Sequence, residues 1–346
     1  MIYTNLPHTD IEVSKICLGT MTWGNQNTEE EGHEQINYAI DKGVNFLDTA
    51  ELYPVPAHKD RYAATEKVIG NWFKKNGNRE DIVLASKIAG KADMTKFIRT
   101  TGFTRESIID AVEGSLQRLQ TDYIDLYQLH WPDRSTNYFG QRGYKHDISD
   151  HWEDNIHQVL ETMLDLIREG KIKHVGISNE TPWGTMRFLE ESKVHGTLPR
   201  TITVQNPYSL LNRLFEVGMA EIAMREQVGL LAYSPMGFGA LSGKYLGDRM
   251  PEGSRLSLFP QYNRYIGDTA VEATKRYYDL AQTNGLSLAQ MALAFVNSRP
   301  FVTSTIIGAT SIRQLEENIG SIDVNLSDDI IQQIEGIHNS IPNPAP

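Results

Sequence analysis

The sequence predicts a (β/α)8 barrel, the α/β fold in which eight parallel strands close into a ring and helices cover its outside. Three observations support this prediction. Short apolar runs recur eight times, an amphipathic stretch follows each of them, and the repeat fills almost the whole chain of 346 residues. Strands that alternate with helices form right-handed β-α-β units and a parallel sheet, and eight such units close a barrel. We therefore expect one domain over residues 1–346.

The elements can be assigned in order along the chain. Two short apolar runs at residues 2–6 and 11–13 flank the turn residues Pro7 and His8, which predicts an N-terminal β-hairpin. The runs predicted to form the barrel strands are residues 15–18, 45–47, 82–86, 124–129, 173–177, 202–204, 229–232 and 303–307.

Helix boundaries are visible in the capping residues. Thr28 and Glu31 have the spacing of a capping box at the start of the first helix. Two helices exceed the eightfold count, at residues 287–298 and 327–340, and we expect both of these extra helices to pack outside the barrel. The final residues 341–346, IPNPAP, are predicted to form a disordered tail.

Composition and charge narrow the class of protein. The hydrophobic content of 40% is ordinary for a globular chain, and the formal net charge of -11 comes without any cluster of Lys and Arg that could follow a nucleic acid. No apolar run is long enough to span a bilayer, and the N-terminus lacks the order of a signal peptide. The single cysteine, Cys17, is typical of a reducing compartment. We expect a cytoplasmic protein with no nucleic-acid or membrane partner.

Polar residues gather where the predicted strands end. Three long connections, at residues 54–63, 131–154 and 246–268, also follow strands, and in a barrel such loops meet at one mouth. The residues that close the apolar runs are Asp48, Lys87, His130, Ser178, Asn179, Gln205, Tyr233 and Gly308. A single polar strand end can simply meet solvent, but the whole set indicates a functional site.

Four residues at this mouth suit the reduction of a carbonyl group, which needs a hydride on carbon and a proton on oxygen. Tyr53 could supply the proton if the cation of Lys87 stabilises its phenolate. Asp48 would keep Lys87 charged, and His130 would donate a hydrogen bond to the substrate oxygen. Each residue alone has a simpler structural explanation, such as a turn cap or a core histidine. Together, on successive strands, they indicate a catalytic site.

Two late loops, at residues 234–244 and 308–318, offer a site for the hydride donor. The first combines glycines, hydroxyls and Lys244, and the second opens a helix whose N-terminus attracts anions. These features suit a pyrophosphate and a ribose phosphate. Gly237 and Gly239 do not form a Rossmann fingerprint, because their spacing and their place late in the chain are wrong for it.

Two other kinds of site are rejected. Residues 176–180 resemble a nucleophile elbow but have Glu180 where the second glycine belongs. His146, His151 and His157 lack the i, i+4 spacing that places two ligands on one helical face, and nothing near them completes a zinc pattern. The sequence therefore predicts no metal site.

Seven blocks, in order, resemble the aldo-keto reductase family: FLDTAELY, LASK, LYQLHWP, GISN, QNPYSLLNR, AYSPMGFGALSGKY and IIGATSIRQLEENI. Within the family the chain is most similar to the bacterial Tas-type branch, with the potassium-channel β-subunits as wider relatives. The resemblance implies a (β/α)8 barrel and an NADPH-dependent reductase of aldehydes or ketones. Its catalytic residues would be Asp48, Tyr53, Lys87 and His130.

The resemblance also implies which residues bind the cofactor NADPH or NADP+. Ser178, Asn179 and Gln205 would hold the nicotinamide amide, and Tyr233 would stack on its ring. The pyrophosphate, the adenosine and its 2'-phosphate would meet Ser234, Met236, Ser242, Lys244, Arg255, Gly308, Thr310, Gln314, Glu317 and Asn318.

The substrate pocket would be lined by Trp23, Trp131 and Tyr53, with Phe139 and Tyr144 as further candidates from the long loop. Aromatic walls suit a moderately apolar aldehyde or ketone, so the predicted partner is a small carbonyl compound. The alternative is a protein that binds the cofactor but turns over little substrate. Such a protein would be a redox sensor or an accessory subunit, as the channel β-subunits illustrate.

Overall fold

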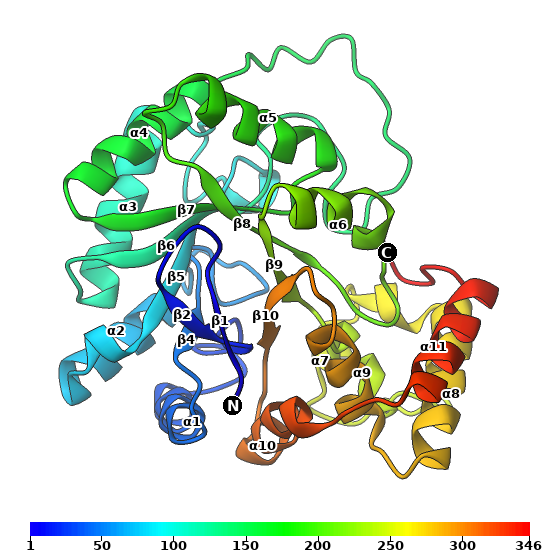
Figure 1. The fold of residues 1–346 in the computed structure, drawn as a ribbon. Helices are drawn as coiled ribbons and strands as arrows, with labels where there is room; N and C mark the ends of the chain where they lie inside the picture. Colours follow the sequence, from blue (N-terminus) through cyan, green and yellow to red (C-terminus); the bar gives the residue numbers. More distant parts are fainter.

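The computed structural model describes residues 1–346 and contains a closed barrel of eight parallel strands (Figure 1). The strands lie in the order β10-β3-β4-β5-β6-β7-β8-β9 around the ring. Their bounds are β3 Ile16–Gly19, β4 Phe46–Asp48, β5 Val83–Ile88, β6 Ile124–Leu129, β7 Ile172–Ser178, β8 Thr201–Pro207, β9 Gly229–Tyr233 and β10 Val302–Ile307. Each strand overlaps one of the predicted apolar runs, so the predicted barrel is confirmed.

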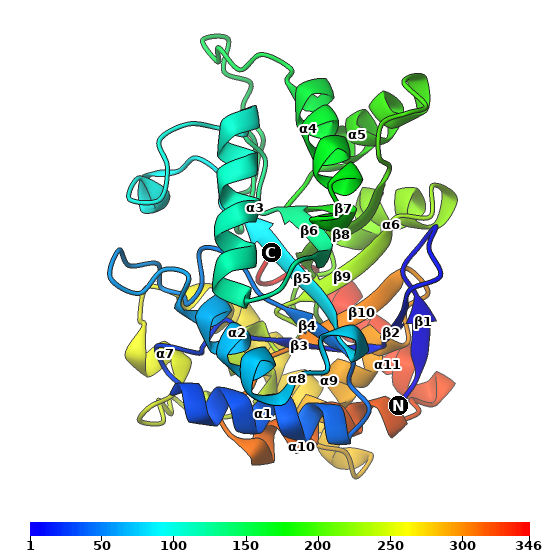
Figure 2. The same ribbon diagram turned by 90° about the vertical axis from the view of Figure 1, so that its left-hand side faces the viewer.

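An antiparallel hairpin of β1 (Tyr3–Asn5) and β2 (Glu12–Ser14) lies at the end of the barrel opposite the long loops, as Figure 2 shows. Leu6, which follows β1, is fully buried and packs in one cluster with barrel-lining residues such as Phe46 and Leu126. Burial of a leucine side chain stabilises a fold by about 1.5–3 kcal/mol. The predicted hairpin is therefore confirmed, and it closes this end of the barrel with an apolar plug.

Helices cover the outside of the barrel. Their bounds are α1 Glu29–Asp41, α2 Ala64–Asn76, α3 Arg105–Leu119, α4 Ile156–Arg168, α5 Pro182–Val194, α6 Phe215–Arg225, α7 Arg255–Leu258, α8 Asp268–Thr283, α9 Leu288–Asn297, α10 Ile312–Gly320 and α11 Asp328–Ser340. At α1 the Thr28 hydroxyl accepts from the N–H of Glu31, whose carboxylate accepts from the N–H of Thr28, so the capping box is present. None of the helices combines the length and the apolar character that a membrane crossing requires.

Of the eleven helices, α8 and α11 lie outside the layer that covers the barrel and the short α7 lies in the loop after β9, so the extra helices are not the pair that we expected. α9 packs on β10 and α10, whereas α8 packs against α11 at the edge of the molecule (Figure 1). α9 therefore belongs to the barrel layer and is not an extra helix as expected, whereas the extra helix expected at residues 327–340 is present as α11. Eight of the ten residues of α9 are buried, because the helix is apolar around its whole circumference and such a helix is stable only in the interior.

The C-terminal tail, residues 341–346, is ordered, contrary to the prediction. Ala345 is 1% exposed, and its N–H donates to the backbone oxygen of Leu211 at 3.0 Å. The Asn343 side chain accepts from the N–H of Arg213 at 2.7 Å. These contacts hold the tail against the loop that follows β8. The proline-rich composition of the tail does not reveal that it makes such contacts.

Candidate functional site

An ion pair between Lys87 and Asp48 lies where β4 and β5 end. The Lys87 ammonium is 2.6 Å from Oδ2 of Asp48, 2.8 Å from the backbone oxygen of Thr49 and 3.5 Å from the phenol oxygen of Tyr53. These acceptors use all three N–H groups of the ammonium. Lys87 is 0% and Asp48 2% exposed, so loss of either partner would leave an uncompensated buried charge.

Tyr53 and His130 complete the cluster. Their ring centroids are 5.7 Å apart at an interplanar angle of 76°, and the Lys87 ammonium is 4.9 Å from the centre of the Tyr53 ring. The His130 ring makes no hydrogen bond within the protein, and its Nδ1 is buried without a partner. Buried polar groups are normally satisfied, so a phenol and an imidazole left with spare capacity are suited to a small polar ligand.

The protonation states follow from burial and charge. Burial alone lowers the pKa of Lys87, but Asp48 and Tyr53 outweigh it and hold that pKa above its ordinary value. Burial raises the pKa of Tyr53 and outweighs the opposing charge of Lys87. Burial, with Lys87 in addition, keeps the pKa of His130 well below its ordinary value. At neutral pH the cluster therefore contains a charged lysine, a protonated phenol and a neutral imidazole.

The alternation of side chains along each strand explains why these residues meet. Residues two apart on a strand point to the same face, and the apolar residues Phe46 and Ala85 belong to the cluster inside the barrel. Asp48 lies two residues after Phe46 and Lys87 two residues after Ala85, so both side chains point to the inside of the barrel at the ends of β4 and β5. The structure thus brings together the four residues predicted for catalysis.

Two glutamines support Asp48, and only one of them was predicted for the site. Nε2 of Gln205 lies 2.8 Å and Nε2 of Gln128 lies 3.3 Å from the same oxygen, Oδ1 of Asp48. Gln205 was expected to hold the nicotinamide amide, and Gln128 was missed. The inward position of Gln128 on β6, next to Lys87 of β5, was the signal that could have identified it.

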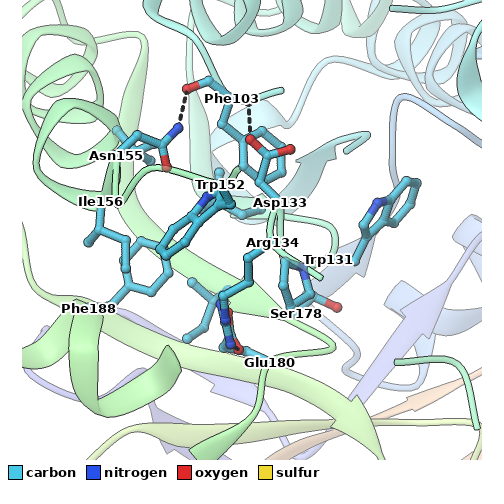
Figure 3. Close-up of a pocket in the computed structure, with 14 residues that line it drawn as sticks. Phe103, Trp131, Asp133, Arg134, Trp152, Asn155, Ile156, Ser178, Glu180 and Phe188 are labelled. Atoms are coloured by element: carbon cyan, nitrogen blue, oxygen red, sulfur yellow. Dashed lines mark hydrogen bonds and ion pairs between the residues drawn. The ribbon is translucent and has the colours of Figure 1, made fainter. Parts of the chain in front are cut away.

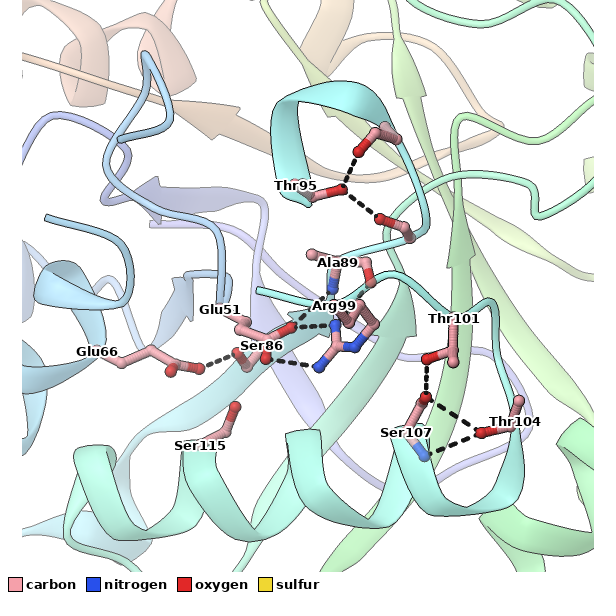
Figure 4. A network of polar contacts seen from close by, with 12 residues as sticks. Glu51, Glu66, Ser86, Ala89, Thr95, Arg99, Thr101, Thr104, Ser107 and Ser115 are labelled. Carbon is pink, nitrogen blue, oxygen red and sulfur yellow. Dashed lines mark hydrogen bonds and ion pairs between the residues drawn. The ribbon is translucent and has the colours of Figure 1, made fainter. Parts of the chain in front are cut away.

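A second buried ion pair, also missed from the sequence, joins the loops that follow β4 and β5 (Figure 4). Arg99 binds both carboxylate oxygens of Glu51, at 2.6 and 2.7 Å. The same carboxylate accepts from the N–H of Ala89 at 3.0 Å, and Arg99 donates to the Ala89 oxygen at 2.7 Å. Glu51 lies two residues before Tyr53, and Ala89 two residues after Lys87. The pair therefore fixes the segments that carry Tyr53 and Lys87.

The residues predicted for the nicotinamide lie beside this cluster. Ser178 Oγ donates to the backbone oxygen of Gln205 at 2.8 Å, and Asn179 Nδ2 donates to that of His130 at 2.9 Å. The Tyr233 hydroxyl donates to Oδ1 of Asn179 at 2.5 Å. Asn179 has φ +53°, a left-handed conformation that is rare outside glycine and that clusters at functional sites.

The loop after β9 holds residues predicted for the pyrophosphate. Ser234 has φ +51°, Met236 packs against the core, and the Ser242 hydroxyl donates to the Gly239 oxygen at 2.8 Å. Lys244 forms no salt bridge; its ammonium lies 5.2 Å from the centre of the Tyr245 ring. This lysine therefore keeps its charge available for an anion.

Arg255 is the second unpaired cation of this region. Its guanidinium lies 4.8 Å from the ring centre of Phe238 and 5.9 Å from that of Tyr262, and its Nε is buried without a partner. Its guanidinium donates to the sulfur of Met21 at 4.0 Å. A guanidinium without an acidic partner is well suited to a phosphate group, which it can bind through two parallel hydrogen bonds.

The start of α10 presents the remaining predicted residues. Oε1 of Gln314 accepts from the N–H and the hydroxyl of Thr310, at 3.0 and 3.1 Å, and Asn318 Nδ2 donates to the Gly308 oxygen at 3.2 Å. Glu317 is half-buried on the same helix. The first N–H groups of a helix attract anions. Together with the two unpaired cations, these residues fit a nucleotide cofactor with phosphate groups.

Trp131 borders the catalytic cluster. It is 1% exposed, its ring lies 4.9 Å from that of His130, and it packs in one apolar cluster with Tyr53. Tyr138 stacks on it with centroids 6.5 Å apart, and Met21 also packs against this cluster. Tyr138 and Met21 were not predicted beside Trp131, because both lie in loops whose conformation the local sequence pattern does not determine.

Two aromatic residues lie elsewhere than predicted. Trp23 is 0% exposed, packs on Gly32 and Val68, and donates from its indole to Oε1 of Gln35 at 3.2 Å. Its side chain therefore fills the core between α1 and α2 and does not line a substrate pocket. Tyr144 is 60% exposed and its hydroxyl shares a hydrogen bond with its neighbour His146, whereas the ring centroid of Phe139 lies 5.7 Å from that of Trp131.

A small cavity lies next to the cluster (Figure 3). Trp131, Ser178 and Trp152 line it, but none of the four catalytic candidates does. Its volume of about 20 Å³ has room for about one water molecule. The ion pair of Arg134 and Glu180, at 2.5 Å, borders it. This cavity is a gap in the packing beside the site and too small for an organic substrate.

Comparison with known proteins agrees with this architecture. The model of the aldo/keto reductase family matches residues 15–339. The chain is 47% identical to "Protein tas" of Escherichia coli over the full length of both chains. It is 42% identical to an aldo-keto reductase of Babesia bovis, covering 69% of this chain and 88% of the relative. It is 32% identical to the uncharacterized oxidoreductase YrpG of Bacillus subtilis, covering 97% and 96%. This chain is therefore an oxidoreductase that belongs to the aldo-keto reductase family.

Proposed function

We propose that the protein is an NADPH-dependent reductase of small aldehydes or ketones. One observation carries this proposal: the phenol of Tyr53 lies 3.5 Å from a buried, charged lysine and beside a neutral imidazole that has no protein partner. This arrangement can protonate an oxygen atom on which negative charge develops. The family generally uses a nicotinamide cofactor, which when bound supplies a hydride.

Each residue has a distinct part in this proposal. The substrate oxygen accepts hydrogen bonds from Tyr53 and His130, which holds the carbonyl carbon in a fixed orientation. Tyr53 then transfers its proton to that oxygen, and Lys87 stabilises the phenolate that remains. Asp48 keeps Lys87 charged in a buried site, and Gln128 and Gln205 hold the carboxylate in place. Trp131 and Tyr138 exclude water from this space.

The phosphate group that distinguishes NADPH from NADH has proposed partners in Lys244, Arg255 and Gln314. Both cations lack acidic partners in the protein, and a phosphate would satisfy them. The cytoplasm, where NADPH is available, is the proposed location, since the chain has only one cysteine.

The proposal is tested by multiple-turnover oxidation of NADPH and NADH over a panel of aldehydes and ketones. We expect turnover of several carbonyl compounds with NADPH preferred. Tyr53→Phe should lower kcat by about 10²–10⁴-fold while the Kd for NADPH stays nearly unchanged. Tight NADPH binding without turnover of any carbonyl compound would instead indicate a redox sensor or accessory subunit. Wild-type kcat in Tyr53→Phe would show that this phenol is not the proton donor.

A further inference from the structure

Three side chains of α4 and α5, none of them in the catalytic cluster, converge on one point of the surface. Glu191 and His195 are one helical turn apart at the end of α5, and His157 is the second residue of α4. Nδ1 of His157 lies 2.7 Å and Nε2 of His195 lies 3.2 Å from the same atom, Oε1 of Glu191. One possible ligand atom of each residue lies within 4.8 Å of those of the other two.

We propose that these residues bind one transition-metal dication of the zinc type, with a fourth position open to water. Imidazole nitrogen and carboxylate oxygen are common zinc ligands, at roughly 2.0–2.2 Å from the ion. Two ligands of one tetrahedral ion therefore lie roughly 3.3 Å apart. The two contacts to Oε1 are already close to that separation, and both imidazoles are 46% exposed, so small rotations bring them into place.

The surroundings of Glu191 suit this role. Its second oxygen, Oε2, accepts from Arg187 at 2.7 Å, which fixes the carboxylate and leaves Oε1 to face the two histidines. Hydrogen bonds of this kind orient the ligands of many metal sites. The charge of Arg187 opposes a cation, but its Nε also donates to Asp154 at 2.9 Å, so a second carboxylate balances it.

The bound ion would join the first turn of α4 to the last turn of α5. The long loop of residues 131–155 ends at α4, and Trp152 of this loop packs on Trp183 of α5 with centroids 6.4 Å apart. The metal would therefore fix the downstream end of the loop that carries Trp131 and Tyr138. Its effect is one of stability and loop anchoring, with no part in the chemistry of the catalytic cluster.

The test uses the full-length chain without a histidine tag, stripped of metal with a chelator. Calorimetric titration with Zn²⁺ and the visible spectrum of Co²⁺ should both show one ion per chain. Zn²⁺ at a free concentration of a hundred times its Kd should raise the Tm of the chain by about 2–5 °C. His157→Ala and His195→Ala should each weaken binding about tenfold or more. His146→Ala and His151→Ala, exposed histidines of the preceding loop, are the matched controls and should bind like the wild type.

The metal-free melting temperature of each variant separates loss of the site from loss of the fold. Because both imidazoles are half-exposed, the metal-free variants should have the same melting temperature as the metal-free wild type. The proposal is overturned if the chain binds no ion, if His157→Ala and His195→Ala bind as tightly as the wild type, or if the loop controls lose binding equally.

Discussion

The strand ends and the long loop after β6 meet at the same mouth but are built differently. At the strand ends, Asp48, Lys87 and His130 are 0–6% exposed, and the first two bond to each other across neighbouring strands, while Asp48 also accepts from Gln205 of β8. In the loop, Tyr144 is 60% and Ile148 93% exposed. Between Tyr144 and Ser149 the hydrogen bonds, such as that from the Ser149 hydroxyl to Asp147, join residues only two apart.

This difference assigns different tasks to the two regions. Side chains anchored to a ladder of strands keep a geometry that proton transfer requires, whereas an exposed loop can change sequence without unfolding the barrel. We therefore expect substitutions at the strand ends to reduce kcat and stability, and substitutions in the loop to alter KM between substrates. Four substitutions test this division, in order of decreasing expected effect.

Lys87→Met should have the largest effect. It leaves the Asp48 carboxylate buried without a cation, which costs about 3–5 kcal/mol in the free energy of unfolding. It also removes the charge that we propose to stabilise the phenolate of Tyr53. Urea unfolding and kcat should both show the loss. The double variant Asp48→Asn with Lys87→Met should recover stability but not activity. Recovery of activity in the double variant would contradict the role of Lys87.

Glu51→Gln should have the next largest effect. It leaves Arg99 with one charged partner fewer and loosens the segments that hold Tyr53 and Lys87, which we expect to cost about 1–3 kcal/mol of stability. Because Glu51 acts by positioning, kcat should fall about tenfold while the Kd for NADPH is unchanged. A rise in KM with an unchanged kcat would show instead that the pair serves substrate binding.

His130 should make stability depend on pH. Burial depresses its pKa in the folded state, so below about pH 6.5 the unfolded chain takes up a proton that the folded chain does not. The contribution of the neutral His130 side chain to the free energy of unfolding is complete above pH 6.5. It falls by about 1 kcal/mol between pH 6.5 and 5.5. Urea unfolding of His130→Asn over this range should lack that slope, whereas His146→Asn, in the exposed loop, should retain it.

Ile148→Ser should have the smallest effect. Its side chain is 93% exposed, so the free energy of unfolding should stay within about 0.5 kcal/mol of the wild type. If the loop selects substrates, KM should shift for bulky carbonyl compounds and stay constant for the smallest aldehyde. A loss of kcat comparable to that of Glu51→Gln would remove the distinction between the two regions.

Local patterns in the sequence were sufficient for much of the architecture. Apolar runs, the capping box at Thr28 and the turn at Pro7 depend on neighbours within a few residues, so the barrel and the hairpin could be predicted. The positions of Asp48, Lys87 and His130 also follow, because a parallel barrel brings its strand ends to one mouth. The residues around Glu51 gave no comparable sign of its ion pair with Arg99, which lies 48 residues further along the chain.

By itself, then, the sequence determined the number and order of the barrel elements and the identity of the polar strand ends. Only the tertiary structure decided that α9 is interior, that Trp23 belongs to the core, and that the C-terminal tail docks on the loop after β8. It also decided the support of Asp48 by Gln128 and Gln205, which are 80 and 157 residues away, and the meeting of His157 with Glu191 and His195. The physical reason is the same in each case: these contacts join distant segments, so packing, and not local periodicity, determines them.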